Sequence, residues 1–343
     1  MTLPPSLPAL SREVRLVARP RALPAPEHFA VAEVPLQGPA PGHVLVRNRY
    51  FLVFPGLRTL MGEESAGVPL PPLRPGDTVF GPAVGEVVVA PPGGQLRAGD
   101  RVMHLRGWRE YAEVAAGECV PLGGELPEVA YLNQGVAAYG ALTRLAAVRT
   151  GDVVLVTGAA GAVGSMAGQI ARLLGAGRVI GTTGSPRKAE RLTGELGYDA
   201  VVLRGSGSFA DRLTEAAPDG IDVLLDTVAG EQLTAAVAAA RPGARFALVG
   251  ALSGQLSARR AGGSAPTTLD AYRLVIQGVS LRGYRGTDHP DVPAEWTRHL
   301  ATWLRTKAIT FPHTLIPGLT DAPQALQDLL KGAHFGPVIV QLP

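Results

Sequence analysis

The pattern of hydrophobic and polar positions changes about one third of the way along the chain. Before residue 126, short alternating or β-branched apolar runs end at turns rich in Pro, Gly and Asp. Alternation of this kind predicts half-buried strands, because successive side chains of a strand point to opposite faces. We therefore predict a twisted, partly closed β domain with strands at 44–49, 84–89 and 111–115.

After residue 126, strand patterns alternate with helical ones. A helical pattern over 129–147 leads into strands at 153–157, 178–182, 200–203, 222–227 and 245–250. Helices are predicted between them at 163–174, 187–196 and 230–240. Strands that alternate with helices of this length predict an α/β fold with a doubly wound parallel sheet. A polar loop at 253–264 is a candidate mobile flap, and the chain closes with a strand at 279–284, helices at 293–307 and 322–330, and a strand at 338–342.

Composition limits the classes of function. The 343 residues, 46% of them hydrophobic and 18% charged, suit a soluble globular protein of two lobes. The uncharged, Pro-rich N-terminus lacks the pattern of a secretory signal, so we expect a cytoplasmic protein without a membrane span. The net charge of +3 is not clustered, which argues against nucleic acid as a partner. Cys119, the single cysteine, excludes a disulfide framework, and we expect an inert thiol there rather than a nucleophile.

A glycine-rich turn follows the predicted strand at 153–157. Its glycines are spaced G-x-x-G-x-x-G and stand directly before a predicted helix. Glycines let the backbone approach a pyrophosphate, and a helix N-terminus offers free N–H groups to an anion. The alternative is a structural turn that happens to be rich in glycine. We predict dinucleotide binding at Gly158, Ala160, Gly161, Ala162, Val163 and Gly164.

The end of the next predicted strand indicates which dinucleotide binds. NAD sites place an acid there for the ribose 2′-hydroxyl, but no acid occurs before Glu190. A hydroxyl and cations suit a 2′-phosphate instead, although the cations could also be a solvated helix start. We therefore predict NADPH, with Gly184, Ser185 and Lys188 at this corner and Arg204 completing the clamp.

Several further blocks stand in the order of a known family. They include GPAVGEVV at 81–88, AGDRV at 98–102, GWREYA at 107–112, GVAAY at 135–139 and LRGY at 281–284. With the glycine turn, the chain resembles the zinc-free medium-chain dehydrogenase/reductases, in the leukotriene/prostaglandin reductase and alkenal double-bond reductase branch. The resemblance implies a Rossmann domain over 128–286. It also implies a GroES-like, twisted β-barrel catalytic domain over 1–127 completed by 287–343, and usually a homodimer.

The resemblance also implies contacts with NADPH. Arg204 stands where the family usually has Tyr, and it can still hold phosphate. His334 stands where the family usually has Asn, so a surface histidine and a ligand contact remain equally open there. The other positions at which family members contact the cofactor are Asn133, Gly250, Ala251, Leu252 and Tyr284.

The chemistry follows from the missing zinc ligands. The stretch GEESAG at 62–67 lacks the His of the Gly-His-Glu element of zinc dehydrogenases, and we predict no metal. Without a Lewis acid, an alkoxide loses its usual stabilisation. Hydride delivery to the β-carbon of an enone or enal needs only hydrogen-bond donors and then a proton at the α-carbon. We therefore predict an NADPH-dependent ene-reductase. An NADPH:quinone reductase and a non-catalytic NADPH-binding protein remain open.

The substrate end departs from the family pattern. Phe54 stands where the family has Asp, Gly56 where it has a pocket-lining Tyr, and Ile276 where it has the Tyr often proposed as proton donor. In one interpretation, Phe54 and Ile276 line a repacked pocket and solvent protonates the enolate. In the other, Tyr272 supplies the hydroxyl, provided that the stretch is helical and the two residues share a face. We expect a larger, more apolar pocket for a bulky, polyketide-like enone of secondary metabolism, with ring closure if the enolate meets an internal electrophile.

Overall fold

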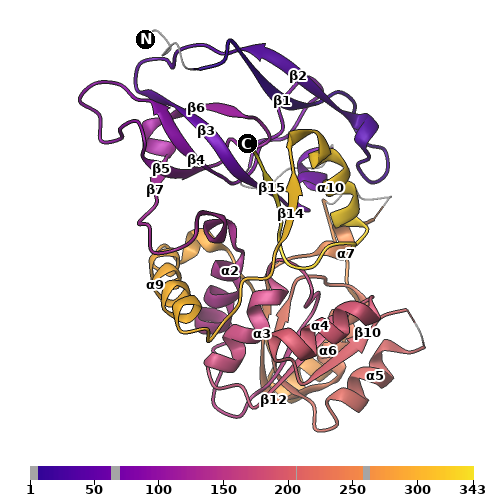
Figure 1. Ribbon diagram of the computed structural model, residues 1–343. Helices are drawn as coiled ribbons and strands as arrows, with labels where there is room; N and C mark the ends of the chain where they lie inside the picture. Colours follow the sequence, from indigo (N-terminus) through magenta and orange to yellow (C-terminus); the bar gives the residue numbers. More distant parts are fainter. Residues whose placement is uncertain (1–6, 63–69, 206, 258–262) are drawn as a thin grey trace. The chain divides into compact units, whose positions relative to one another are not determined.

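The computed structural model in Figure 1 describes residues 7–62, 70–205, 207–257 and 263–343. The chain divides into two compact units, residues 1–132 with 313–343 and residues 133–312. Residues 287–312, expected with the first lobe, thus belong to the second unit. The reason is that helix α9 (Val292–Arg305) packs on α2 (Gly135–Gly140) through rings such as Trp296 and Tyr139. Which chemical role each unit has stays a prediction.

The first unit is built on β-structure. Strands β1 (Leu10–Leu16) and β2 (Phe29–Pro35) form an antiparallel pair. A mixed sheet has the order β14-β15-β3-β4-β5-β7, with β6 paired to β3. Its buried centre holds Val44, Val46 and Val102, and the predicted strands at 44–49, 84–89 and 111–115 are confirmed within it. The bounds are β3 His43–Val53, β4 Ala83–Val89, β5 Arg101–His104, β6 Tyr111–Ala115, β7 Val120–Pro121, β14 Thr314–Pro317 and β15 Val338–Gln341, with helices α1 Leu57–Leu60 and α10 Ala322–Leu330.

The second unit is the predicted doubly wound parallel sheet. Its strand order is β10-β9-β8-β11-β12-β13, and each neighbouring pair is parallel. Strands such as β8 and β10 are continuous apolar runs, as expected for a sheet covered by helices, and Leu155, Ile180 and Phe246 are buried at its centre. Chain order reverses between β8 and β11, which is where such sheets bind ligands. The bounds are β8 Val153–Val156, β9 Arg178–Thr183, β10 Ala200–Leu203, β11 Ile221–Asp226, β12 Ala240–Leu248 and β13 Ser280–Gly283.

Helices flank this parallel sheet (Figure 1). The predicted helix at 230–240 is shorter than expected, because α6 ends at Ala238 and β12 starts at residue 240 rather than 245. A further helix, which was not predicted, occupies 209–216, with Phe209 and Leu213 buried one turn apart. The bounds are α3 Gly164–Leu173, α4 Pro186–Leu196, α5 Phe209–Ala216, α6 Glu231–Ala238, α7 Leu252–Gln255 and α8 Ala271–Gln277.

The helix predicted over 129–147 is interrupted. A 3-10 segment at Glu128–Leu132, α2 and a π-helical segment at Ala141–Leu145 replace it. At the break, Asn133 Oδ1 accepts hydrogen bonds from the N–H of Gly135 and from Nε1 of Trp296, both at 2.9 Å. This contact spans more than 160 positions, so local periodicity does not reveal it.

The loop predicted as a flap over 253–264 begins in helix α7. Residues 258–262 of that loop lie outside the described residues. Within the described part of the chain, no helix combines the length and apolar character needed to cross a membrane.

Candidate cofactor site

The glycine-rich turn lies between the carboxyl end of β8 and the start of α3. Gly158 has φ +60°, and a Cβ there would lie 2.6 Å from Thr227 Oγ1. A Cβ at Gly164 would collide with the Gly158 carbonyl oxygen, so these two positions require glycine. At Gly161 a Cβ would meet only the Gly158 oxygen, at 3.2 Å, which leaves space over the turn. This geometry allows a ligand to approach the backbone and the N-terminal N–H groups of α3.

The turn is hydrogen-bonded to the next strand. Gly158 N–H donates to Thr182 Oγ1 at 3.0 Å, and that hydroxyl donates to Gln232 Oε1 at 2.5 Å. Thr182 and Gln232 are both buried. The sequence does not reveal either residue as part of the site, because threonine and glutamine do not mark a nucleotide site. Their bonds hold the turn in place against β9.

The corner after β9 gathers four of the predicted residues. Ser185 caps α4 by accepting from Lys188 N–H at 3.4 Å. A Cβ at Gly184 would lie 3.2 Å from Arg204 Nη2, so the guanidinium lies beside that glycine. Burial and then the charge of Arg204 lower the pKa of Lys188. Two cations that repel each other here would both be stabilised by a dianion, so these residues fit the 2′-phosphate of NADPH.

The stretch 250–252 follows β12 at the same edge of the sheet as the glycine turn, because all of these strands are parallel. Gly250 and Ala251 are exposed, and Leu252 starts α7. A hollow of about 450 Å³ lies beside them, with apolar walls that include Leu233, Leu248 and Leu281. Two of the predicted contacts, Gly250 and Ala251, therefore border open, apolar space.

Asn133 and Tyr284 are both packed near α2. Asn133 is buried and uses its Oδ1 for the two bonds described above. Tyr284 stacks on His289 with ring centroids 5.5 Å apart, and its hydroxyl lies against Gly140. Burial raises the pKa of Tyr284. His334 is half-buried in the first unit, so its contact with a cofactor stays a prediction.

Phe54 and Gly56 are structurally coupled in the first unit. A Cβ at Gly56 would lie 2.9 Å from Phe54 Cε2, and one at Gly81 would lie 3.2 Å from Phe54 Cε1. The half-buried ring therefore covers both glycines. The ring occupies the space that a side chain at 56 would need, so the enlargement expected at this position is not seen. The expected apolar character remains.

Tyr272 and Ile276 lie on α8, which confirms that this stretch is helical. They are four residues apart and therefore share a face. Their exposed fractions in the second unit are 75% and 62%. A role of Tyr272 as proton donor and of Ile276 as pocket lining stays a prediction.

Cys119 does not have the environment of a nucleophile. It is buried, and burial followed by the charge of Glu118 raises its pKa to about 11. Only the thiolate is reactive, so the side chain is inert at neutral pH.

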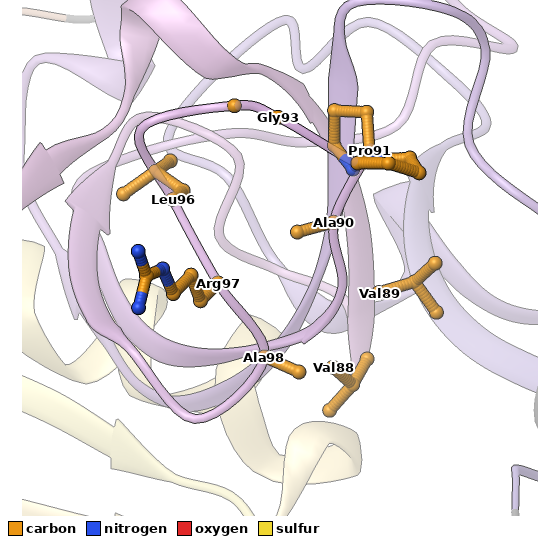
Figure 2. A pocket seen from close by; sticks show the side chains of 10 residues that line it. Val88, Val89, Ala90, Pro91, Gly93, Leu96, Arg97 and Ala98 are labelled. Atoms are coloured by element: carbon orange, nitrogen blue, oxygen red, sulfur yellow. The ribbon is translucent and has the colours of Figure 1, made fainter.

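A second hollow, of about 420 Å³, lies in the first unit at the loop between β4 and β5. Figure 2 shows its lining from Val88 to Ala98, which is apolar apart from Arg97. Its lining contains no acid, histidine or nucleophile. We assign it no part in the chemistry.

Comparison with known proteins identifies the family. Residues 162–304 match a family described as zinc-binding dehydrogenase, and residues 12–122 match the N-terminal domain of oxidoreductase. The putative NADP-dependent oxidoreductase YfmJ of Bacillus subtilis is 31% identical, over 97% of this chain and 98% of its own. The chain belongs to the zinc-free medium-chain dehydrogenase/reductases, in the prostaglandin reductase branch.

Other members of the family are similarly close. The NADPH-dependent curcumin reductase of Escherichia coli is 28% identical over 95% of each chain. The structure of CurA from Vibrio vulnificus in complex with NADPH superposes with a TM-score of 0.87, at 29% identity over 97% of this chain and 99% of the other. Despite the zinc-binding description of one family, the described residues contain no group of three or more His, Cys, Asp or Glu that could hold a metal ion.

Proposed function

We propose that this protein is an NADPH-dependent reductase that delivers hydride to the β-carbon of an α,β-unsaturated carbonyl. The main structural support for this proposal is the pair of cations, Lys188 and Arg204, at the corner beside the glycine-rich turn, because this corner fits NADPH. Relatives named for reducing curcumin and prostaglandins support the class of substrate, including a bovine prostaglandin reductase 1 that is 30% identical over 95% of its length. The enzyme is an oxidoreductase that acts on C=C bonds.

Different residues of the chain would bind different parts of NADPH and the substrate. Backbone N–H groups of the glycine turn bind the pyrophosphate, and Lys188 with Arg204 holds the 2′-phosphate. Gly184 leaves room for the Arg204 guanidinium, and Ser185 fixes the start of α4 beside it. When bound, NADPH supplies the hydride. The contacts at 250–252 with Asn133 and Tyr284 would orient the reactive end, and the apolar ring of Phe54 would line the substrate pocket.

The experiment that tests this function is a product analysis. Purified protein is incubated with NADPH and a panel of enones, enals and quinones, and the enones and enals should be converted to the saturated ketones and aldehydes. Allylic alcohols as products would contradict C=C reduction.

The proton donor is a separate question. We propose solvent as the source and keep Tyr272 as the alternative, because its exposed hydroxyl shares a helix face with Ile276. A Tyr272→Phe variant is expected to keep its turnover number if solvent protonates the enolate. A large loss of turnover without a change in NADPH affinity would assign the role to Tyr272.

We further propose a bulky, polyketide-like enone as substrate, with a role in secondary metabolism. The apolar residues Phe54 and Ile276, which stand where the family has polar ones, support this choice. Specificity constants for a series of enones of increasing size should rise with apolar bulk. A preference for small alkenals would contradict the proposal, and cyclic products from substrates that carry an internal electrophile would reveal ring closure.

Quinone reduction is the second candidate. It is favoured by a probable quinone oxidoreductase of Leishmania amazonensis, 30% identical over 72% of this chain and 74% of its own. Formation of a hydroquinone or semiquinone without any saturated ketone would select it. Tight NADPH binding without NADPH oxidation across the panel would instead select the non-catalytic NADPH-binding protein.

We also propose a homodimer. Strand β13 is an edge of the parallel sheet, and the neighbouring α8 exposes Tyr272, Val275 and Ile276. An exposed edge strand beside apolar side chains is a surface that a second copy could cover. Light scattering after size exclusion should give twice the chain mass of 35.6 kDa. The mass of a single chain would contradict the dimer.

A further inference from the structure

A buried carboxylate lies behind the glycine-rich turn and has no part in the proposed chemistry. Asp226, the last residue of β11, is 0% exposed. It accepts hydrogen bonds from Thr157 Oγ1 at 2.5 Å, from Val228 N–H at 2.9 Å and from Ala229 N–H at 3.0 Å. Burial of a carboxylate is unfavourable unless such donors satisfy it. The side chain is therefore an acceptor around which the loop after β11 is arranged.

The loop that Asp226 holds has an unfavourable backbone conformation. Ala229 and Gly230 have φ of +64° and +63°, in the left-handed region that an alanine avoids. Charge-assisted bonds from the N–H groups of Val228 and Ala229 to the carboxylate oppose that strain. Strained backbone persists where the surroundings determine it, and it gathers at ligand sites.

This loop connects the two sides of the cofactor site. On one side, Thr227 Oγ1 donates to Thr157 O at 2.9 Å and lies where a Cβ of Gly158 would be. On the other side, Asp226 O accepts from Val249 N–H at 2.7 Å, and Thr227 O accepts from the N–H of residue 252 at 3.1 Å. The positions of the glycine turn and of residues 250–252 therefore both depend on loop 227–230.

We propose that Asp226 is a positioning residue for NADPH. It holds loop 227–230 so that the turn at Gly158 and the backbone at 250–252 contact one cofactor molecule. This inference rests on the proposed NADPH-dependent function. None of the hydrogen bonds of Asp226 reaches the corner at Lys188. Loss of the carboxylate should therefore weaken the pyrophosphate and nicotinamide contacts and spare those to the 2′-phosphate.

Fluorescence titration of Asp226→Asn with two ligands tests this inference. NADPH spans the whole site, whereas adenosine 2′-monophosphate carries the adenosine end and the 2′-phosphate but no phosphate at the 5′ position for the glycine turn. The variant should bind NADPH about tenfold more weakly, equivalent to about 1.4 kcal/mol. Its Kd for adenosine 2′-monophosphate should stay within about twofold of the wild type.

The matched control is Asp152→Asn. Asp152 is also buried, accepts from Arg149 N–H at 2.7 Å and pairs with Arg245, but it precedes β8 at the opposite edge of the sheet. This variant should lower the unfolding midpoint and leave both Kd values unchanged. Thr157→Val removes the hydroxyl that donates to Asp226, so it should reproduce the selective loss of affinity for NADPH. The double variant should lose no more affinity for NADPH than either single variant, because the hydroxyl and the carboxylate act as a unit.

The outcomes separate the two proposals. If the wild type binds NADPH and the Kd for NADPH is unchanged in Asp226→Asn and Thr157→Val, the inference about Asp226 is overturned and the proposed function is not. An equal rise in the Kd values of both ligands also overturns the inference, because a general loss of structure would have that effect. Wild-type protein that binds neither ligand overturns the proposed function and the inference together. If Asn at 226 prevents folding, the Thr157→Val titration decides by the same criteria.

Discussion

The coupling between Phe54 and Gly56 can be measured by adding a single methyl group. Gly56 has φ −57° and ψ −23°, a backbone conformation that alanine adopts easily. By reducing the conformational entropy of the unfolded chain, Gly56→Ala should therefore stabilise the folded protein by about 0.4–1 kcal/mol. The new Cβ would lie 2.9 and 3.0 Å from two ring carbons of Phe54, well inside the 3.5–4.0 Å optimum. The opposite edge of the ring lies over Gly81, which limits its retreat. Overpacking of this kind costs about 1–3 kcal/mol, so we expect a net loss of about 1 kcal/mol.

In a Phe54→Leu background the ring carbons are absent, and the same change at Gly56 should stabilise by about 0.5 kcal/mol. The coupling free energy between the two positions is then about 1–2 kcal/mol. Urea unfolding of the wild type, both single variants and the double variant measures it. Equal effects of Gly56→Ala in the two backgrounds, within about 0.5 kcal/mol, would refute the packing argument.

Three further predictions concern pH, backbone strain and cofactor choice. Burial and then two neighbouring arginines lower the pKa of His104 to about 3, so its contribution to stability is complete above about pH 6.5 and is lost as the pH falls toward 3. Between pH 6.5 and 5.5 the free energy of unfolding, measured in urea, should therefore fall by about 1 kcal/mol more in the wild type than in His104→Asn, and equal slopes would contradict this. Ala229→Gly should raise the unfolding free energy by about 0.5 kcal/mol, because relief of left-handed strain exceeds the added chain entropy, whereas a loss of stability would contradict it. Lys188→Ala and Arg204→Ala should each raise the KM for NADPH about tenfold or more and leave the KM for NADH unchanged, and equal effects on both cofactors would remove the 2′-phosphate from this corner.

The parallel sheet was predictable because strands such as β8 and β10 are apolar along their whole length and because helical patterns separate the strands. The errors have nonlocal or weak causes. The helix over 129–147 is interrupted where Asn133 bonds to Trp296, far along the chain. Helix α5 was missed because only Phe209 and Leu213 mark its buried face. Periodicity over so short a segment has little to distinguish it from a loop.

The cofactor corner was predictable for a different reason. Gly184, Ser185 and Lys188 are close in sequence, and the residue types themselves indicate a phosphate. Asp226 was not predictable, because its importance lies in hydrogen bonds to Thr157 and to a strained loop. The filling of the space at position 56 also depends on a side chain whose direction only the structure gives.

The central claim is that hydride goes to the β-carbon of an activated double bond. NADPH carrying deuterium at the transferred position of C4, incubated with the protein and an acyclic enone, tests this claim most directly. The account predicts a saturated ketone with one deuterium on the β-carbon, seen by mass spectrometry and deuterium NMR. An allylic alcohol with the deuterium on the former carbonyl carbon would contradict it.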